Sequence, residues 1–339
     1  MLQEEWDHFQ HFLYRITASL AVITNLILIH LILHHSPKSL GTYKYLMIGI
    51  CLFEIFYEAL DLAASPDIYT KNSAFLIVIS DKKSPFPVYM LLGINLAYCA
   101  CFGVSLTIFA VHFVYRYIVL IGNKTLTIKS IKNIFFWQSV PLGVGVFWMI
   151  SAWYFDSQEE FLDRVLRKEM RLHYGLELER MAYVGPYLYP LDEKGKQFVN
   201  WKAIYGMALF VVLISISLYT MAYFGIKSYR KINSAVTKTA RSTNFKTLQT
   251  QLLTALILQT IIPLTLMHFP SGICFLIPFF ESSREVFGRF LTISISLYPV
   301  LDPLPNMFLI KEYRRALFRN LNIVSKIQKT SSLNLTSKV

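Results

Sequence analysis

The sequence predicts an all-α membrane protein: a bundle of seven transmembrane helices with its N-terminus outside and a short amphipathic helix after the last span. The length of its apolar runs and the uneven charge of the loops between them support this. A hydrocarbon core about 30 Å thick needs roughly 20 apolar residues of helix. With 54% hydrophobic and 16% charged residues among 339, the chain has no room for a large soluble domain.

Seven runs are long enough to cross a bilayer. Five of them contain no Asp, Glu, Lys or Arg: Ile16–Pro37, Ser84–Tyr115, Asn133–Phe155, Ala203–Ile226 and Thr247–Phe280. The other two contain acids: Tyr45–Ala64 with Glu54, Glu58 and Asp61, and Phe290–Ile310 with Asp302. Since soluble core helices seldom reach such lengths seven times in one chain, the protein is predicted to be polytopic.

The charges of the loops set the orientation. Segments 34–44, 116–133, 227–250 and 311–339 hold 19 basic residues and one acid, whereas the opposite set, including residues 1–11, holds 13 basic residues and 16 acids. Lys and Arg accumulate on the cytoplasmic side. We therefore expect an extracellular N-terminus (1–11), a seven-helix domain (12–310) and a cytoplasmic tail (311–339).

The formal net charge of +12 raises the question of nucleic acid. The basic residues are separated by apolar runs and form no patch interleaved with stacking aromatics, so membrane lipids are the expected partner of this charge and nucleic acid is not. The start of the tail supports a membrane partner. Apolar positions there repeat every four residues and are surrounded by Lys311, Arg314, Arg315 and Arg319, which indicates a short helix on the inner leaflet.

Polar residues within the spans are candidates for a switch. Glu54 lies near mid-membrane, and Asn25 and Asp302 are expected at similar depths. Acids at this depth usually face the bundle interior. A cluster of these three residues would be either an ion or water site that rearranges when the bundle changes state, or a static set of interhelical hydrogen bonds.

Arg116 and a set of prolines mark other places where the helices could change. Arg116 stands where the third run meets the basic inner side, as a snorkelling anchor or as a latch at the cytoplasmic mouth. Pro263, Pro270 and Pro278 in the sixth run, and Pro299, Pro303 and Pro305 in the seventh, remove backbone hydrogen bonds and favour kinks.

The long outer loop, 156–202, carries two local signals. Ser157-Gln-Glu-Glu160 is a capping-box pattern ahead of apolar residues, which predicts a short helix over the mouth of the bundle. Farther along, Tyr183–Tyr189 and Phe198–Trp201 flank Asp192-Glu-Lys-Gly195, which predicts a hairpin.

Rival classes lack the residues that they need. The string from His30 to His35 is one histidine box where di-iron membrane enzymes need several. The seventh run has no lysine for a retinal Schiff base, and no inverted repeat of the transporter type is visible. No catalytic constellation appears in a loop large enough to house one. We therefore expect no catalytic residues, no cofactor and no metal, and a receptor rather than an enzyme.

Several strings resemble one receptor family. These are Leu40-Gly-Thr-Tyr-Lys-Tyr-Leu-Met47, Tyr98-Cys-Ala-Cys-Phe102, His112-Phe-Val-Tyr-Arg-Tyr117, Leu258-Gln-Thr-Ile-Ile-Pro263 and Tyr298-Pro-Val-Leu-Asp-Pro303. Together they resemble the Str group of nematode seven-transmembrane chemoreceptors, along the whole chain and in order. The resemblance implies a multi-pass G-protein-coupled receptor in the plasma membrane of chemosensory cilia, which binds small odorant molecules.

The resemblance also has limits. Tyr115 precedes Arg116 where rhodopsin-type receptors keep an acid, so a lock of the acid–Arg kind is absent. Asp302-Pro303 resembles the Asn/Asp-Pro element of helix seven, but the tyrosine that usually follows is missing.

The resulting expectation is a chemosensory receptor that binds a small molecule within the bundle and activates a heterotrimeric G protein. A ligand-gated channel or transporter of similar shape is the alternative. Candidate pocket residues, chosen by depth, are Asn95, Tyr98, Tyr205, Met207, His268 and Ser271. Candidate residues facing the G protein are Arg116, Tyr117, Lys124, Lys129, Lys227, Arg230 and Lys231.

Overall fold

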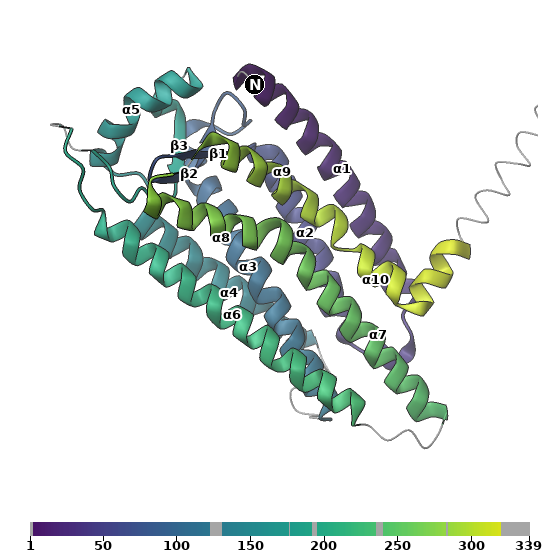
Figure 1. Ribbon diagram of the computed structural model, residues 1–339. Coiled ribbons are helices and arrows are strands. Elements are labelled where there is room, and N and C mark those ends of the chain that lie inside the picture. The colour runs from purple at the N-terminus through teal and green to yellow at the C-terminus, as the bar shows by residue number, and fades with distance from the viewer. Residues whose placement is uncertain are drawn as a thin grey trace, which may run out of the picture.

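A bundle of long helices forms the body of the protein (Figure 1). The computed structural model describes residues 3–122, 131–175, 177–191, 195–234, 240–282 and 284–319. The helices that build the bundle are α1 (Gln3–His35), α2 (Tyr43–Ala64), α3 (Val88–Leu120), α4 (Ile131–Asp156), α6 (Trp201–Asn233), α7 (Ala240–Pro263), α8 (Phe269–Leu276), α9 (Glu285–Leu301) and α10 (Leu304–Leu309). Each of the seven predicted spans is helical, the sixth being α7 with α8 and the seventh α9 with α10.

Length and composition single out most of these spans. In the described part of the chain, five helices are long and apolar enough to cross a membrane, and a bent pair, Glu285–Leu309 with Lys311–Arg319, would be a sixth. The remaining span, α2, carries Glu54, Glu58 and Asp61, and all three side chains are buried inside the bundle. Acids at this depth turn inward because lipid cannot solvate them.

The prolines interrupt the sixth and seventh spans as predicted. After Pro263 the helix passes through a π-helical turn, Leu264–His268, before α8 begins. Likewise, α9 ends at Leu301 and α10 starts after Pro303. A proline lacks the N–H that an uninterrupted helix would use, so the backbone rearranges next to it.

A three-stranded antiparallel sheet covers the outer end of the bundle, near the N-terminus (Figure 1). It consists of β1 (Asp67–Lys71), β2 (Ala74–Ser80) and β3 (Met181–Val184), with β2 in the centre. Val78 pairs with Asp67 on one side and Tyr183 on the other. We call this sheet the lid. None of its strands was predicted from the sequence.

Helix α5 (Glu160–Tyr174) packs on the lid, which confirms the predicted outer helix. Its Leu162, Leu166 and Met170 are buried in one cluster with residues of the strands. The predicted cap is wrong, however. Glu159 precedes the helix, and the Ser157 hydroxyl donates instead to the Trp153 carbonyl at 2.5 Å, back into α4.

The predicted hairpin forms as a short pairing of extended segments. Asn200 N–H donates to the Leu188 carbonyl (2.8 Å), Phe198 N–H donates to the Pro190 carbonyl (3.2 Å), and Leu191 forms an antiparallel bridge with Gln197. The turn itself, at 192–194, lies outside the described residues. Tyr183 belongs to β3 rather than to this pairing.

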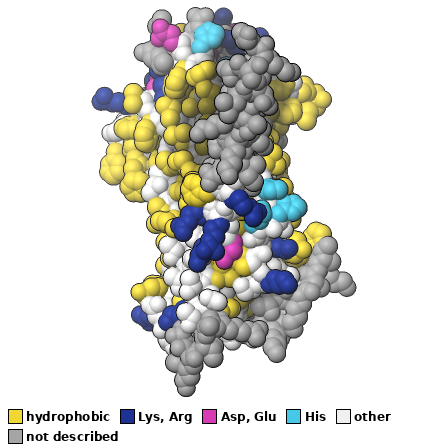
Figure 2. All heavy atoms as spheres, turned by 90° about the vertical axis from the view of Figure 1, so that its right-hand side faces the viewer, with side chains coloured by type: hydrophobic (Ala, Val, Ile, Leu, Met, Phe, Trp, Pro, Cys, Tyr) yellow, Lys and Arg dark blue, Asp and Glu magenta, His cyan; other side chains and the backbone are white. Residues whose placement is uncertain are grey.

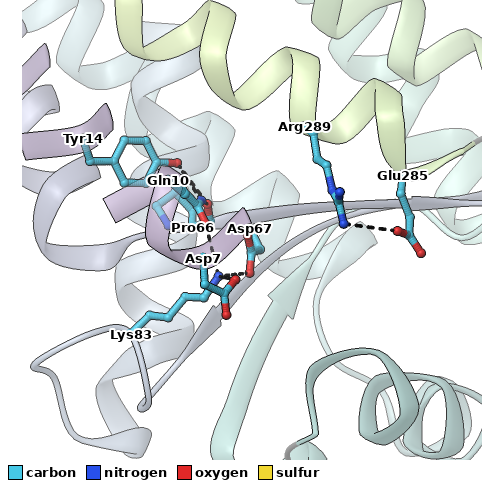
Figure 3. A network of polar contacts seen from close by, with 8 residues as sticks. All are labelled: Asp7, Gln10, Tyr14, Pro66, Asp67, Lys83, Glu285 and Arg289. Carbon is cyan, nitrogen blue, oxygen red and sulfur yellow. Dashed lines mark hydrogen bonds and ion pairs between the residues drawn. The ribbon is translucent and has the colours of Figure 1, made fainter. Parts of the chain in front are cut away.

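The N-terminal segment, as far as it is described, is helical and continuous with the first span in α1. Figure 3 shows how it is held. The Lys83 ammonium lies 2.7 Å from an Asp7 carboxylate oxygen and 2.5 Å from one of Asp67, at the start of β1. Gln10 and Tyr14 both donate to the Pro66 carbonyl. These contacts join α1 to the lid.

At the inner end, the helix Lys311–Arg319 turns by 99° from the seventh span. Its Tyr313 is fully buried and its hydroxyl shares a 2.7 Å hydrogen bond with that of Ser36, whereas Arg314 and Arg315 are exposed. This confirms the amphipathic helix over the described residues. Figure 2 shows Lys and Arg side chains gathered at this level, beyond a wide band of apolar side chains.

Candidate ligand cavity and inner switch

A small enclosed cavity of about 60 Å³ lies under the lid, in the outer half of the bundle. Helices α2, α3, α4, α6, α8 and α9 all contribute to its walls, and β1, β2 and β3 contribute to its roof. Its polar lining residues are Tyr57, Tyr98, Cys99, Asp156 and Ser271. The rest of the lining is apolar or glycine, which is the usual composition of a small-molecule site.

Aromatic side chains shape this cavity. Trp148 stacks on Phe210 with ring centroids 4.4 Å apart, and Phe75 of β2 meets Phe275 of α8 at 4.8 Å. Gly103 makes room for Trp148, because a Cβ there would lie 2.7 Å from the indole ring. Rigid aromatic walls favour a pocket that exists before the ligand arrives.

Two features fix the lid above the cavity. Asn95 of α3 donates from Nδ2 to the carbonyls of Ile77 in β2 (2.7 Å) and Ala182 in β3 (3.3 Å). Gly185, directly after β3, has φ of 148°, and a Cβ there would lie 2.1 Å from the Phe75 carbonyl oxygen. Strands β2 and β3 are therefore held on α3. At Gly185 the backbone lies so close to β2 that there is no space for a side chain.

Polar contacts between α5 and the lid lie outside the membrane spans. The Tyr69 hydroxyl donates to Glu169 and the Tyr183 hydroxyl donates to Asp163, each at 2.8 Å. Burial, followed by the neighbouring carboxylates, raises the pKa of both tyrosines. Burial raises the pKa of Tyr187 to about 12 as well. All three favour the neutral phenol.

Two of the six predicted pocket residues, Tyr98 and Ser271, line the cavity. His268 lies one layer deeper, where it shares a 3.2 Å hydrogen bond with Ser105 and meets the cavity residue Phe102 edge-on. Asn95 holds the lid instead of facing the cavity, and Met207 packs with Leu188 and Ala203.

The prediction for Tyr205 is wrong, because its side chain is 61% exposed on α6. Depth alone could not tell the inner face of α6 from its outer face. Asp156 was not among the predicted pocket residues, since position 156 was assigned to the outer loop, whereas it is the last residue of α4.

A larger hollow does not compete with this cavity as a ligand site. It is an open groove of about 820 Å³ between α2, α3 and α4, lined mainly by apolar residues such as Leu52, Phe56 and Leu142. These side chains are exposed, and they belong to membrane-spanning helices. The groove is thus a lipid-facing surface.

At mid-bundle, the predicted switch residues lie in one buried polar region. Asn25 donates to the Pro299 carbonyl at 3.2 Å. Asp302 accepts from Gln259 at 2.5 Å, and Gln259 in turn accepts from Asn306 at 2.8 Å. Sequence reasoning did not identify Gln259 and Asn306, since an amide in an apolar helix gives no signal of its partner.

Glu54 is the least satisfied member of this region. Its carboxyl group lies close enough to Asp302 and Asn25 to interact with both, yet neither oxygen meets hydrogen-bond geometry with a described residue. An unpaired buried polar atom costs roughly 1–3 kcal/mol. The region therefore combines a chain of hydrogen bonds, Asp302–Gln259–Asn306, with an incomplete site at Glu54.

Arg116 is buried at the inner end of α3, so the snorkelling interpretation is wrong. Its side chain is 2% exposed. Nη2 donates to the Gln249 side-chain oxygen of α7 at 2.5 Å and to the Gln249 carbonyl at 3.3 Å, and the guanidinium lies 5.0 Å from the centroid of the Tyr43 ring. Arg116 thus links α3 to α7, with a neutral amide where an acid would form an ion pair.

The other residues predicted to face a G protein divide into three groups. Tyr117 is half-buried against Phe224, with Lys227 above its ring. Arg230 and Lys231 are exposed at the inner end of α6. Lys124 and Lys129 lie outside the described residues.

Comparisons with known proteins agree on family and fold. The profile of the serpentine seven-transmembrane G-protein-coupled chemoreceptors of the Str type matches residues 10–318. The G-protein coupled receptor str-217 of Caenorhabditis elegans is 34% identical over 91% of this chain and 89% of its own. The serpentine receptor class r-10 of the same organism is 30% identical over 94% of each chain.

A solved structure shows the same architecture. Squid rhodopsin superposes with a TM-score of 0.66, covering 96% of this chain and 87% of its own, at 12% sequence identity. At that identity the likeness concerns the fold alone.

Proposed function

This chain belongs to the Str family of serpentine seven-transmembrane G-protein-coupled chemoreceptors, and from that membership we propose that it binds a small odorant in the cavity under the lid and activates a heterotrimeric G protein. The family is a receptor family rather than an enzyme class. Plasma membrane of the sensory cilium is the proposed location. The observation that carries the proposal is the aromatic cavity, enclosed by the lid and by six helices of the bundle.

The mechanism is a shift of population between two arrangements of the bundle. A ligand acts only through its different affinity for the two states. The cavity touches α8 and α9, which continue the two spans that carry Gln249, Gln259 and Asp302. Ligand contacts with Ser271 or Phe275 would thus move the sixth span. The inner end of this span is bonded to Arg116 of α3 through Gln249. Separation there would expose a surface to the G protein.

The basic inner surface supports the choice of partner. Arg230 and Lys231 are exposed on α6 beside the half-buried pair Tyr117 and Lys227. Together with Arg116, Lys124 and Lys129, they are the residues we propose to face the G protein. Charge of one sign on this surface favours association with an acidic partner.

A reconstituted receptor tests the proposal. The receptor in nanodiscs, mixed with a purified heterotrimeric G protein, should catalyse nucleotide exchange when a small odorant from a screened panel is added. Ser271→Leu, which fills the cavity, should abolish the response, whereas Ser215→Leu, the same change at an exposed position of α6, should not. Ligand-evoked current in membranes without G protein, and no exchange, would favour a channel and refute the proposal.

A further inference from the structure

We propose that the cavity under the lid selects small, mainly apolar molecules that carry an N–H or O–H group, and that Asp156 accepts a hydrogen bond from this group. The inference rests on the proposed function for its biological setting, but it concerns the chemistry of the ligand. It makes Asp156 a specificity-determining residue.

The size and lining of the cavity limit the ligand first. About 60 Å³ is available, roughly four to six times the 10–15 Å³ that one buried water needs on the same kind of measure. Trp148, Phe210 and Phe102 form tight walls. Only a compact molecule of a few heavy atoms, with mostly apolar surface, fits without opening the bundle.

Asp156 then supplies the chemical preference. It lines the cavity, its side chain is only 4% exposed, and its Oδ1 has no hydrogen-bond partner in the described part of the chain. The neighbouring lid fixes its backbone, since Gly185 N–H donates to the Asp156 carbonyl at 2.9 Å. An acceptor held in place and left unpaired in an apolar cavity favours a ligand that brings the missing donor.

The nearest cation already has partners outside the cavity. Lys202 acts electrostatically on Asp156, but its ammonium forms an ion pair with Glu159 and lies 5.1 Å from the centroid of the Tyr154 ring. Cys99, the other ionisable group acting at this end of the cavity, has its thiol directed to Asn95 at 3.9 Å. Neither group supplies a donor to Asp156 Oδ1.

The rest of the polar lining contributes less. Tyr57 donates to the Met267 sulfur at 3.9 Å, and Tyr98 interacts with Asp61 on the inner side of α2. Both hydroxyls thus already have partners among the described residues. Asp156 is therefore the strongest unpaired acceptor of the cavity.

Pairs of five-membered rings test the inference, because each pair shares its shape and differs in the donor. The probes are pyrrole against furan, for a neutral N–H, and pyrrolidine against tetrahydrofuran, for a cationic one. Binding to the purified receptor in nanodiscs is measured by saturation-transfer NMR titration, without G protein. The receptor should bind at least one N–H ring about tenfold more tightly than its ether partner, or better.

Variants identify the acceptor. Asp156→Ala should abolish the preference. Asp156→Asn should keep a preference for pyrrole and lose any preference for the cation, and Glu160→Gln, an exposed neighbour, should change neither. Equal affinities within both pairs, no measurable binding of either N–H ring, or a preference that survives in Asp156→Ala would each overturn the inference.

The two proposals fail separately. If Asp156→Ala does not fold, the ring preference of the wild-type receptor and the behaviour of Asp156→Asn still decide the question. A receptor that binds the N–H rings as described but never drives nucleotide exchange would refute the proposed function alone. One whose exchange responds equally to rings with and without N–H would refute only the role of Asp156.

Discussion

The guanidinium of Arg116 in α3 donates to the side-chain oxygen of Gln249 in α7 at 2.5 Å, inside the bundle and away from solvent. A hydrogen bond from a charged donor contributes about 1.5–3 kcal/mol. Because it joins the third and sixth spans, it stabilises the arrangement in which their inner ends are together. In this chain the link needs no acid.

Replacement of Gln249 should loosen that link. Gln249→Ala should raise ligand-independent nucleotide exchange by roughly tenfold, the factor that corresponds to about 1.4 kcal/mol, because the closed state loses its bond to Arg116. Gln249→Glu should lower basal exchange, since a carboxylate binds guanidinium more strongly. Thr250→Ala, at the exposed neighbouring position, is the control. Unchanged basal exchange in Gln249→Ala would contradict the role given to this pair.

Lys83 should anchor the outer end of α1. Its ammonium is buried between Asp7 and Asp67 and also donates to Gln10 at 3.1 Å. Lys83→Met removes a cation that lies between two carboxylates and leaves the buried Asp67 without this counter-charge, so we expect a loss of roughly 3 kcal/mol in unfolding free energy. Lys82→Met, at the exposed adjacent residue, should be near neutral. Thermal unfolding of the two variants in detergent makes the comparison, and equal midpoints would show that the network is dispensable.

Two glycines provide a matched test of how tightly the lid is packed. In Gly185→Ala the new methyl group would meet the Phe75 carbonyl, whereas in Gly272→Ala it would meet no atom within 4 Å. We expect Gly185→Ala to lower the free energy of unfolding by about 1–3 kcal/mol and to reduce ligand affinity. Gly272→Ala should behave like wild type. If both variants unfold and bind alike, the lid is not closed at this point.

The mid-bundle polar region predicts opposite effects for two substitutions. Glu54→Met removes carboxylate oxygens that lack partners and should raise the thermal midpoint, because well-packed apolar groups often stabilise such sites. Gln259→Met breaks the bonds to both Asp302 and Asn306 and should lower it. Midpoint measurements on both variants are sufficient. A fall in Glu54→Met as large as that in Gln259→Met would mean that Glu54 has a partner.

Alkaline pH should destabilise the lid by ionising Tyr187. Its pKa is raised to about 12, from an ordinary value near 10. The folded state therefore favours the neutral phenol. The contribution to stability is fully present below pH 10 and is lost as pH rises toward 12. In a difference titration of phenolate absorbance between the wild type and Tyr187→Phe, the missing transition should lie near pH 12; a transition at pH 10 would refute the burial of this hydroxyl.

The bundle could be predicted from sequence because hydrocarbon imposes a strong constraint. An apolar run such as Ser84–Tyr115 must be helical in lipid, and the charge of the loops predicts which side of the membrane each loop faces. The helix α5 was also predicted from a local signal, a start pattern followed by apolar residues, although the cap itself differs. These signals are local, and they do not depend on a partner elsewhere in the chain.

The lid and the inner contacts could not be predicted because they depend on distant partners. Ala74–Ser80 is apolar and rich in branched residues, but it becomes a strand only by pairing with β3, about a hundred residues later. Gln249 and Gln259 look like ordinary polar positions until Arg116 and Asp302 lie beside them. The error at Tyr205 has the same origin, because depth fixes the level of a residue but not its direction around the helix.

One distance measurement tests the central claim that a ligand under the lid moves the inner ends of α3 and α7 apart. Spin labels at Ile121→Cys and Thr250→Cys occupy exposed sites at those ends, and the native cysteines Cys51, Cys99, Cys101 and Cys274 are all buried. Double electron–electron resonance should show a longer distance when an activating odorant is added, and no change when Ser271→Leu is also present. An unchanged distance while the same odorant drives nucleotide exchange would contradict the account.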